Sequence, residues 1–223
     1  MSIDEFIKLL DAITKLLNVL VWPGVLVFIL IQFGSVLREF LQNLGEFSLK
    51  GAGFEASMKR KQAEAAAALA VAGSHRDAEG ATPEGAASTV AKTVTPQIIR
   101  QAGKSTVLWV DDNPNNNIYE RQALEALGLR FTLALSTEEA LDQIRRQRFN
   151  VIISDMGRPP DARAGYTLLD KLRSSGDRTP FIIYASSRSA EHVAEARQRG
   201  AVGCTNRPDE LFEMVLSAIG HRV

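Results

Sequence analysis

Three acidic residues follow two short apolar runs, and together they have the composition of a cation site. Residues 107–110 end in Asp111 and Asp112, and residues 151–154 end in Asp155. Short apolar runs are typical of strands buried on both faces of a parallel sheet. Ligands of such sheets bind beyond the carboxyl ends of the strands, so we expect the three carboxylates to meet there. Because like charges repel, the cluster predicts a hard divalent cation, and Mg²⁺ suits carboxylate ligands.

The elements that must position these acids alternate regularly from residue 105 onward. Strands are expected at 106–110, 131–135, 150–154, 180–184 and 202–205. Helices are expected at 114–127, 137–147, 164–174, 189–199 and 208–220. Ser136 and Glu139 form a capping box at the start of the second helix, and several glycines follow helix ends. Five such units predict an α/β fold with a five-stranded parallel, doubly wound, flavodoxin-like sheet.

The motifs of this region also have a familiar order. They are VLWVDDNPNN (107–116), VIISDMG (151–157), GYTLL (165–169), PFIIYASS (180–187) and NRP (206–208). With them, residues 105–223 resemble a two-component response-regulator receiver domain of the CheY-like kind. The resemblance implies that Asp155 accepts a phosphoryl group. It further implies that Asp111, Asp112 and Asp155 hold Mg²⁺ and that the backbone carbonyl of Gly157 adds a ligand.

The sequence departs from the receiver pattern at the positions that normally read out phosphorylation. Ala185 stands where receivers usually carry Thr or Ser, which leaves the adjacent Ser186 as the possible hydroxyl donor. Arg207 replaces the usual Lys as the phosphate contact, and Cys204 stands in place of the usual aromatic residue. Arg and Lys are not equivalent, because Arg carries a planar fork rather than a point charge. We therefore expect phosphoryl acceptance without the usual switch.

The loop after Asp155, residues 157–165, is long and carries Arg158 and Arg163, and Arg188 could reach the same rim. Two interpretations stay open. The loop is an ordinary solvated loop, or its arginines recognise an anionic group on a partner or ligand.

The N-terminal part of the chain has the pattern of a membrane anchor. Residues 2–15 predict an amphipathic helix, and residues 16–37 contain no charged side chain. At ~1.5 Å per residue such a helix would cross a ~30 Å hydrocarbon core. A signal peptide and a buried soluble helix are the rival interpretations. The excess of basic residues after the span favours a single-pass protein of the inner (cytoplasmic) membrane with the receiver domain in the cytoplasm.

Between the span and the receiver domain, the sequence predicts a stalk and a linker. Residues 38–72 are expected to form a juxtamembrane stalk, with a small hairpin around 51–53 and a helix from 59. Residues 73–104 are rich in Gly, Ala, Ser, Thr and Pro, which favours a flexible linker.

The overall composition excludes several classes of protein. Lys+Arg and Asp+Glu are both 26, so no basic excess indicates a nucleic-acid partner. The one cysteine rules out an intramolecular disulfide. No phosphate-binding loop, nucleotide-binding kinase motif or metalloprotease motif is present, and we expect no enzymatic activity beyond self-phosphorylation and autodephosphorylation.

The leading hypothesis is a membrane-anchored, receiver-only signalling protein. It would take its phosphoryl group from a histidine kinase or a small phosphodonor and pass the signal to an output protein by surface contact. One alternative is a scaffold that keeps the receiver fold but works without phosphorylation, which Ala185 and Arg207 favour. Another is a membrane-bound defence effector with nucleotide hydrolase activity, although no catalytic Glu is evident.

Overall fold

The computed structural model describes residues 53–76, 82–185 and 189–220 of the chain. The chain divides into two compact units, Met1–Glu55 and Ala56–Val223, and the second contains nearly all of the described residues.

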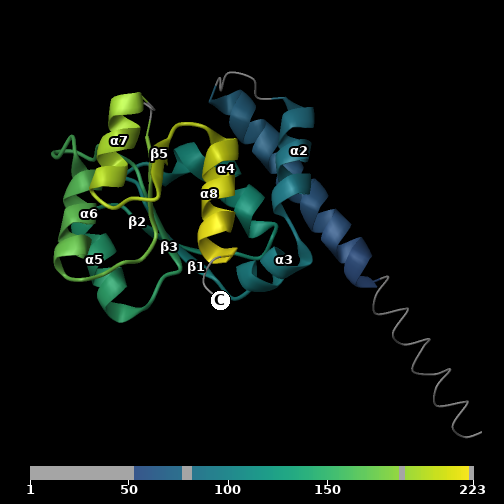
Figure 1. Cartoon of the computed structure of the whole chain (residues 1–223), viewed down its shortest axis with the longest axis horizontal. Helices are drawn as coiled ribbons and strands as arrows, with labels where there is room; N and C mark the ends of the chain where they lie inside the picture. Colours follow the sequence, from purple (N-terminus) through teal and green to yellow (C-terminus); the bar gives the residue numbers. More distant parts are fainter. Residues whose placement is uncertain (1–52, 77–81, 186–188, 221–223) are drawn as a thin grey trace, which may run out of the picture. The chain divides into compact units, whose positions relative to one another are not determined.

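The second unit is built on a five-stranded parallel sheet in the order β2-β1-β3-β4-β5 (Figure 1). Its strands are β1 (Thr106–Val110), β2 (Arg130–Ala134), β3 (Val151–Ser154), β4 (Phe181–Tyr184) and β5 (Gly203–Thr205). Each strand begins and ends within one residue of the position predicted from the sequence. The five-stranded parallel α/β fold is therefore confirmed.

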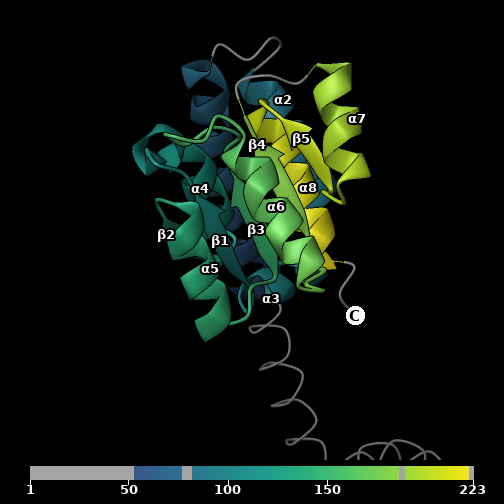
Figure 2. The same cartoon turned by 90° about the vertical axis from the view of Figure 1, so that its left-hand side faces the viewer.

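Helices cover both faces of this sheet. They are the 3-10 helix η1 (Pro114–Asn117), α4 (Ile118–Glu125), α5 (Thr137–Arg146), α6 (Ala164–Ser174), α7 (Ala190–Gln198) and α8 (Pro208–Gly220). Side chains of β1 alternate between two cores, because neighbours on a strand point to opposite faces. Trp109 packs in the core under α4 and α8. Leu108 packs in the core under α5, α6 and α7, which lie in front of the sheet in Figure 2.

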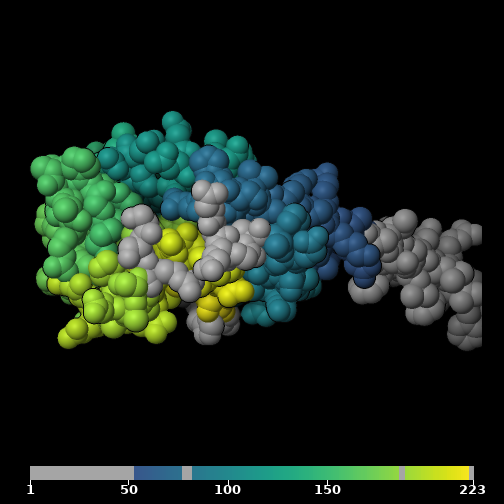
Figure 3. Space-filling view, turned by 90° about the horizontal axis from the view of Figure 1, so that it is seen from above, coloured from purple at the N-terminus to yellow at the C-terminus, as the bar shows by residue number. Residues whose placement is uncertain are grey.

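The segment before the sheet is also helical. A helix over residues 53–75 is followed by α2 (Pro83–Thr93) and α3 (Pro96–Ala102). Leu69 and Val90 are buried in the same core as α4 and α8, and Figure 3 shows these helices in blue against the rest of the unit. Lys61 and Gln62 add hydrogen bonds from the first helix to the backbone carbonyls of Leu127 and Val94.

The expectation of a flexible linker over 73–104 is therefore wrong for its described residues. Each of the two helices starts with a Thr cap followed by Pro, a strong helix-start signal. Thr82 accepts a hydrogen bond from the backbone N–H of Gly85, and Thr95 accepts one from Ile98. The predicted hairpin is wrong for residues 54–58, which are helical.

Within the described residues, no helix is both long and apolar enough to cross a membrane. The predicted amphipathic helix (2–15), the predicted span (16–37) and the first part of the stalk (38–52) lie outside the described residues.

Gly165 provides a test of how closely α6 approaches the end of β3. A Cβ atom at this position would lie 2.5 Å from the backbone oxygen of Asp155. We expect Gly165→Ala to lower the free energy of unfolding by about 1–3 kcal/mol, because overpacking forces the backbone apart. Urea unfolding followed by circular dichroism measures the change.

Gly103→Ala is the matched control. Gly103 has right-handed helical backbone angles, and a Cβ atom there would meet its nearest neighbour at 3.7 Å. We expect a change within about 0.5 kcal/mol. Equal stability of the Gly165→Ala variant and the native protein would show that α6 does not depend on this close approach.

Candidate functional site

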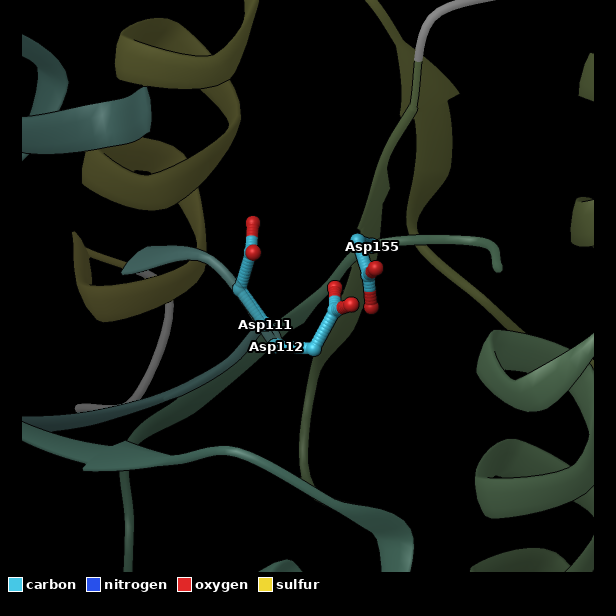
Figure 4. A group of neighbouring side chains, drawn as sticks. All are labelled: Asp111, Asp112 and Asp155. Atoms are coloured by element: carbon cyan, nitrogen blue, oxygen red, sulfur yellow. The ribbon is translucent and has the colours of Figure 1, made fainter. Parts of the chain in front are cut away.

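The structure brings the three predicted acids together. Val110 at the end of β1 and Ser154 at the end of β3 are paired, so the residues that follow them leave the sheet side by side. One carboxylate oxygen from each of Asp111, Asp112 and Asp155 lies within 4.8 Å of the others. Figure 4 shows the carboxylates of Asp112 and Asp155 turned toward each other. This is a donor set that suits a hard divalent cation.

The acids line an open hollow of about 220 Å³ beyond the carboxyl ends of the strands. Gly157, Tyr184 and Ala185 line the same hollow, and so does Arg76, which directly follows the helix 53–75. Gly157 and Ala185 therefore lie at the site, as predicted from the sequence. The Gly157 carbonyl as a metal ligand stays a prediction.

Asp111 is held in one orientation by two hydrogen bonds. Its Oδ1 accepts from the backbone N–H of Asn113 at 2.7 Å, and its Oδ2 accepts from Nδ2 of Asn117 at 2.6 Å. Asp111 is buried, whereas Asp112 is exposed. The hydrogen bonds fix the buried carboxylate in place before any cation binds, so binding would require little rearrangement of that ligand.

Asp155 lies in an environment that opposes its negative charge. The pKa of Asp155 is raised to about 7, mainly by burial and to a smaller extent by the charges of Asp111 and Asp112, although Arg158 acts in the opposite direction. A divalent cation in the hollow would offset the repulsion that these three carboxylates exert on one another. The electrostatics of the site therefore favour a bound cation.

Arg158 is the buried counter-ion of Asp155. Its side chain is 3% exposed, and its guanidinium forms an ion pair with Asp155 and donates to the hydroxyls of Ser154 at 2.8 Å and Thr137 at 3.0 Å. Backbone hydrogen bonds between Arg158 and Asp161 hold the loop in a tight turn that directs this side chain inward. Arg158 is not one of the described residues that line the hollow. It neutralises Asp155 from the protein interior and leaves the hollow open.

Neither interpretation of the loop arginines accounts for Arg158. Its side chain is neither solvated nor available to a partner, because it is buried in an ion pair with Asp155. Arg163 forms an ion pair with Glu195 on α7 and lies over the ring of Tyr166. Arg188, the third of these arginines, and Ser186, the possible hydroxyl donor, lie outside the described residues.

Arg207 follows β5 but is directed toward α8. Its Nε and Nη2 donate to the carboxylate of Asp209 at 3.0 and 2.6 Å, and it lines a different hollow together with Leu69 and Thr82. The structure therefore does not place Arg207 among the residues that line the acidic hollow in the described part of the chain. Cys204 is buried in the core under α7, and burial raises the pKa of its thiol.

Several residues of the site were not predicted from the sequence. Thr137 orients Arg158, and Asn117 orients Asp111, although both look like ordinary helix-start residues in the sequence. Arg76 and Glu120 also meet near the hollow, 44 residues apart in the chain. Only the folded chain shows that they belong to the site.

Replacing Arg158 tests its competition with a cation. We expect Arg158→Met to bind Mg²⁺ about five- to tenfold more tightly, because a positive charge next to the ligand Asp155 is removed. The same change should lower the melting temperature without Mg²⁺, because it leaves the partly buried carboxylate of Asp155 without its partner. Isothermal titration calorimetry and thermal unfolding measure the two effects.

Arg163→Met is the matched control, since its ion pair with Glu195 lies on α7 and it does not contact the acids. We expect its Mg²⁺ affinity to equal that of the native chain. Weaker Mg²⁺ binding by Arg158→Met would mean that Arg158 supports the metal site instead of competing with the cation.

Comparison with known proteins agrees with the fold of the C-terminal part of the chain. Residues 107–216 match the family model described as the response regulator receiver domain. The transcriptional regulatory protein ZraR of Salmonella typhimurium is 27% identical over 53% of this chain and 27% of its own length. The virulence sensor protein BvgS of Bordetella pertussis is 32% identical over 55% of this chain and 10% of its own length. The chain thus spans about a quarter or less of these relatives.

Solved structures of receiver proteins are similar to the same region. The Francisella response regulator 1452 receiver domain is 26% identical, with a TM-score of 0.47, covering 53% of this chain and 98% of that structure. CheY4 of Vibrio cholerae is also 26% identical, with a TM-score of 0.45, covering 51% and 98%. The family match and the order of the strands together identify the C-terminal part of this chain, residues 107–216, as a response regulator receiver domain.

Proposed function

We propose that this chain accepts a phosphoryl group on Asp155 with the help of Mg²⁺ and signals by presenting a surface to a partner protein. The observation that carries the proposal is the convergence of three carboxylates, within 4.8 Å, on an open hollow at the carboxyl ends of β1 and β3. A phosphodonor can reach Asp155 only through such an opening. The fixed orientation of Asp111 supports a site that is ready for a cation.

The chemistry requires little from the protein beyond placement and charge. A carboxylate oxygen of Asp155 would attack phosphorus, a new O–P bond would form, and the donor's leaving group would depart with the electron pair of the broken bond. Bound Mg²⁺ would supply charge neutralisation and orient the donor phosphoryl group. The donor would be a histidine kinase or a small phosphodonor such as acetyl phosphate. Relatives of this region include the sensor histidine kinase RcsC of Escherichia coli.

Incubation of the full chain with acetyl phosphate and Mg²⁺ tests the proposal. We expect the intact mass to increase by one phosphoryl group, with the acyl phosphate located on Asp155 by borohydride trapping and peptide mapping. Asp155→Asn should abolish the product, because an amide is not a nucleophile here. Asp112→Asn should slow its formation at least tenfold, because a metal ligand is lost.

Asp142→Asn is the matched control, since Asp142 is an exposed acid on α5 that pairs with Arg145. It should be phosphorylated at the native rate. If the native chain gains no phosphoryl group from acetyl phosphate or from phosphoramidate, the proposal fails.

A scaffold that works without phosphorylation is the second candidate, and two observations favour it. Arg158 already neutralises Asp155 in the absence of any phosphoryl group, and Ala185 offers no hydroxyl at the hollow. In a host that depends on this protein, the scaffold predicts that Asp155→Asn preserves the phenotype. Loss of the phenotype would favour phosphoryl transfer instead.

We also propose that residues 16–37 anchor the chain in the cytoplasmic membrane with the receiver domain on the cytoplasmic side. Support comes from the uncharged stretch and from the basic residues that follow it. Tethering would raise the effective concentration of the domain near membrane-bound partners.

Cell fractionation tests the anchor. The full chain should stay in the membrane pellet after a carbonate wash, whereas a chain lacking residues 1–37 should move to the supernatant. A chain carrying Val25→Arg and Leu30→Arg within the stretch should behave like the truncated one, because each charge disfavours insertion by about 2.5–3.5 kcal/mol. Release of the native chain by carbonate would contradict the proposal.

A further inference from the structure

Arg76 reaches the acidic hollow from outside the region that matches the receiver family. It follows the helix 53–75, whereas the family match begins at residue 107. Its backbone N–H still donates to the carbonyl of Ala72, so the side chain projects from the last turn of that helix. The helix itself is docked, with Leu69 and Ala72 buried. The fixed end of a packed helix thus places a guanidinium at the hollow.

The guanidinium of Arg76 is bound on three sides. Nε donates to Oε1 of Glu120 at 3.1 Å, and Nη2 donates to Oδ1 of Asn117. The guanidinium carbon lies 4.3 Å from the centre of the Tyr184 ring. The Arg76 side chain is 23% exposed and Glu120 is 3% exposed, so this pair is largely shielded from solvent. Such shielding makes the ion pair stronger than one on an open surface.

The same contacts connect Arg76 to the proposed metal ligands and to β4. Asn117, which accepts from Arg76, donates to Asp111 at 2.6 Å. Glu120, which also accepts from Arg76, accepts from the hydroxyl of Tyr184 at 2.8 Å. Tyr184 is the last residue of β4 and precedes Ala185 at the hollow. Hydrogen bonds therefore connect Arg76 to Asp111 through Asn117, and to Tyr184 through Glu120.

The charge of the hollow would change when Asp155 becomes phosphorylated. Its described lining contains three carboxylates and one guanidinium, that of Arg76. A phosphoryl group adds about −1.5 to −2 charge and three strong acceptor oxygens. Arginine binds such oxygens with two parallel N–H donors. Arg207 lines another hollow and donates to Asp209, and Arg158 pairs with Asp155 from the protein interior, so Arg76 is the guanidinium that lines the hollow among the described residues.

We infer that Arg76 is the cation that contacts the phosphoryl group on Asp155 from the hollow, opposite the buried Arg158, and that it exchanges its bonds to Glu120 for phosphoryl oxygens. The inference rests on the proposed function of Asp155. In receivers the cationic contact is expected to come from a residue after the last strand, here Arg207. The inference assigns this contact to Arg76, at the end of the helix 53–75. Phosphorylation then alters the contacts at the end of helix 53–75 directly, without a hydroxyl at position 185.

Beryllofluoride binding to the full chain in mild detergent tests the inference, with Mg²⁺ affinity measured separately by calorimetry. Tryptophan fluorescence follows the titration, because Trp109 packs edge-on against Tyr184 with ring centres 6.0 Å apart. We expect Arg76→Ala to weaken beryllofluoride binding about 10- to 100-fold, the loss of a charge-assisted contact. Mg²⁺ affinity should be unchanged or tighter, because a positive charge is removed. Arg76→Lys should restore part of the loss.

Arg207→Ala is the matched control, and we expect it to bind beryllofluoride like the native chain. Glu120→Gln provides a change of opposite sign, because it releases Arg76 from its carboxylate partner. We expect it to tighten beryllofluoride binding several-fold, and to lose most of that gain when Arg76→Ala is also present. A purely structural role of Arg76 would instead weaken Mg²⁺ and beryllofluoride together, and Glu120→Gln would tighten neither.

The outcomes separate this inference from the proposed function. If the native chain binds beryllofluoride and Arg76→Ala binds it equally well, the inference is overturned and phosphoryl acceptance stands. A loss in Arg207→Ala but not in Arg76→Ala would assign the contact to Arg207, which also overturns the inference. If the native chain binds no beryllofluoride in the presence of Mg²⁺, the proposed function fails and the inference fails with it.

Discussion

Mutual repulsion among three carboxylates is the constraint around which the rest of this domain is arranged. Parallel pairing of β1 with β3 brings Val110 beside Ser154, and the acids that follow cannot separate. Each of the three acids has different surroundings. Asp111 receives two hydrogen bonds, Asp112 faces solvent, and Asp155 receives a buried arginine. Hydrogen bonds, solvent and a buried arginine thus offset the repulsion among the three acids, and the hollow between them stays open.

Two arginines, Arg158 and Arg76, offset the negative charge of this site in different ways. Arg158 is fixed in the interior by Ser154 and Thr137, so its charge is held beside Asp155. Arg76 lies at the hollow and holds bonds to Glu120 and Asn117 that it could exchange for those of an incoming anion. A fixed charge lowers the cost of the resting state, whereas only an exchangeable one can distinguish a phosphorylated from an unphosphorylated site.

The parts of the molecule that follow from local pattern could be predicted from the sequence. The strands, the sheet class and the meeting of Asp111, Asp112 and Asp155 depend on short apolar runs and on a general rule for parallel sheets. Arg158 could be placed near the acids, but its burial depends on a turn closed by Asp161. The linker expectation was wrong because average composition hid two capped helix starts, at Thr82 and Thr95.

Because the helix 53–75 is packed against the receiver domain, a rearrangement at the acidic hollow can affect how this helix is held. A flexible linker would absorb any rearrangement near Tyr184, because its ends move independently. Instead, Leu69 shares a core with β1 and α8, and Lys61 bonds the carbonyl of Leu127. A helix that is packed from Lys61 to its last turn responds as a unit over that length. An anion that takes Arg76 from Glu120 would therefore change the free energy with which the helix that ends at residue 75 is docked.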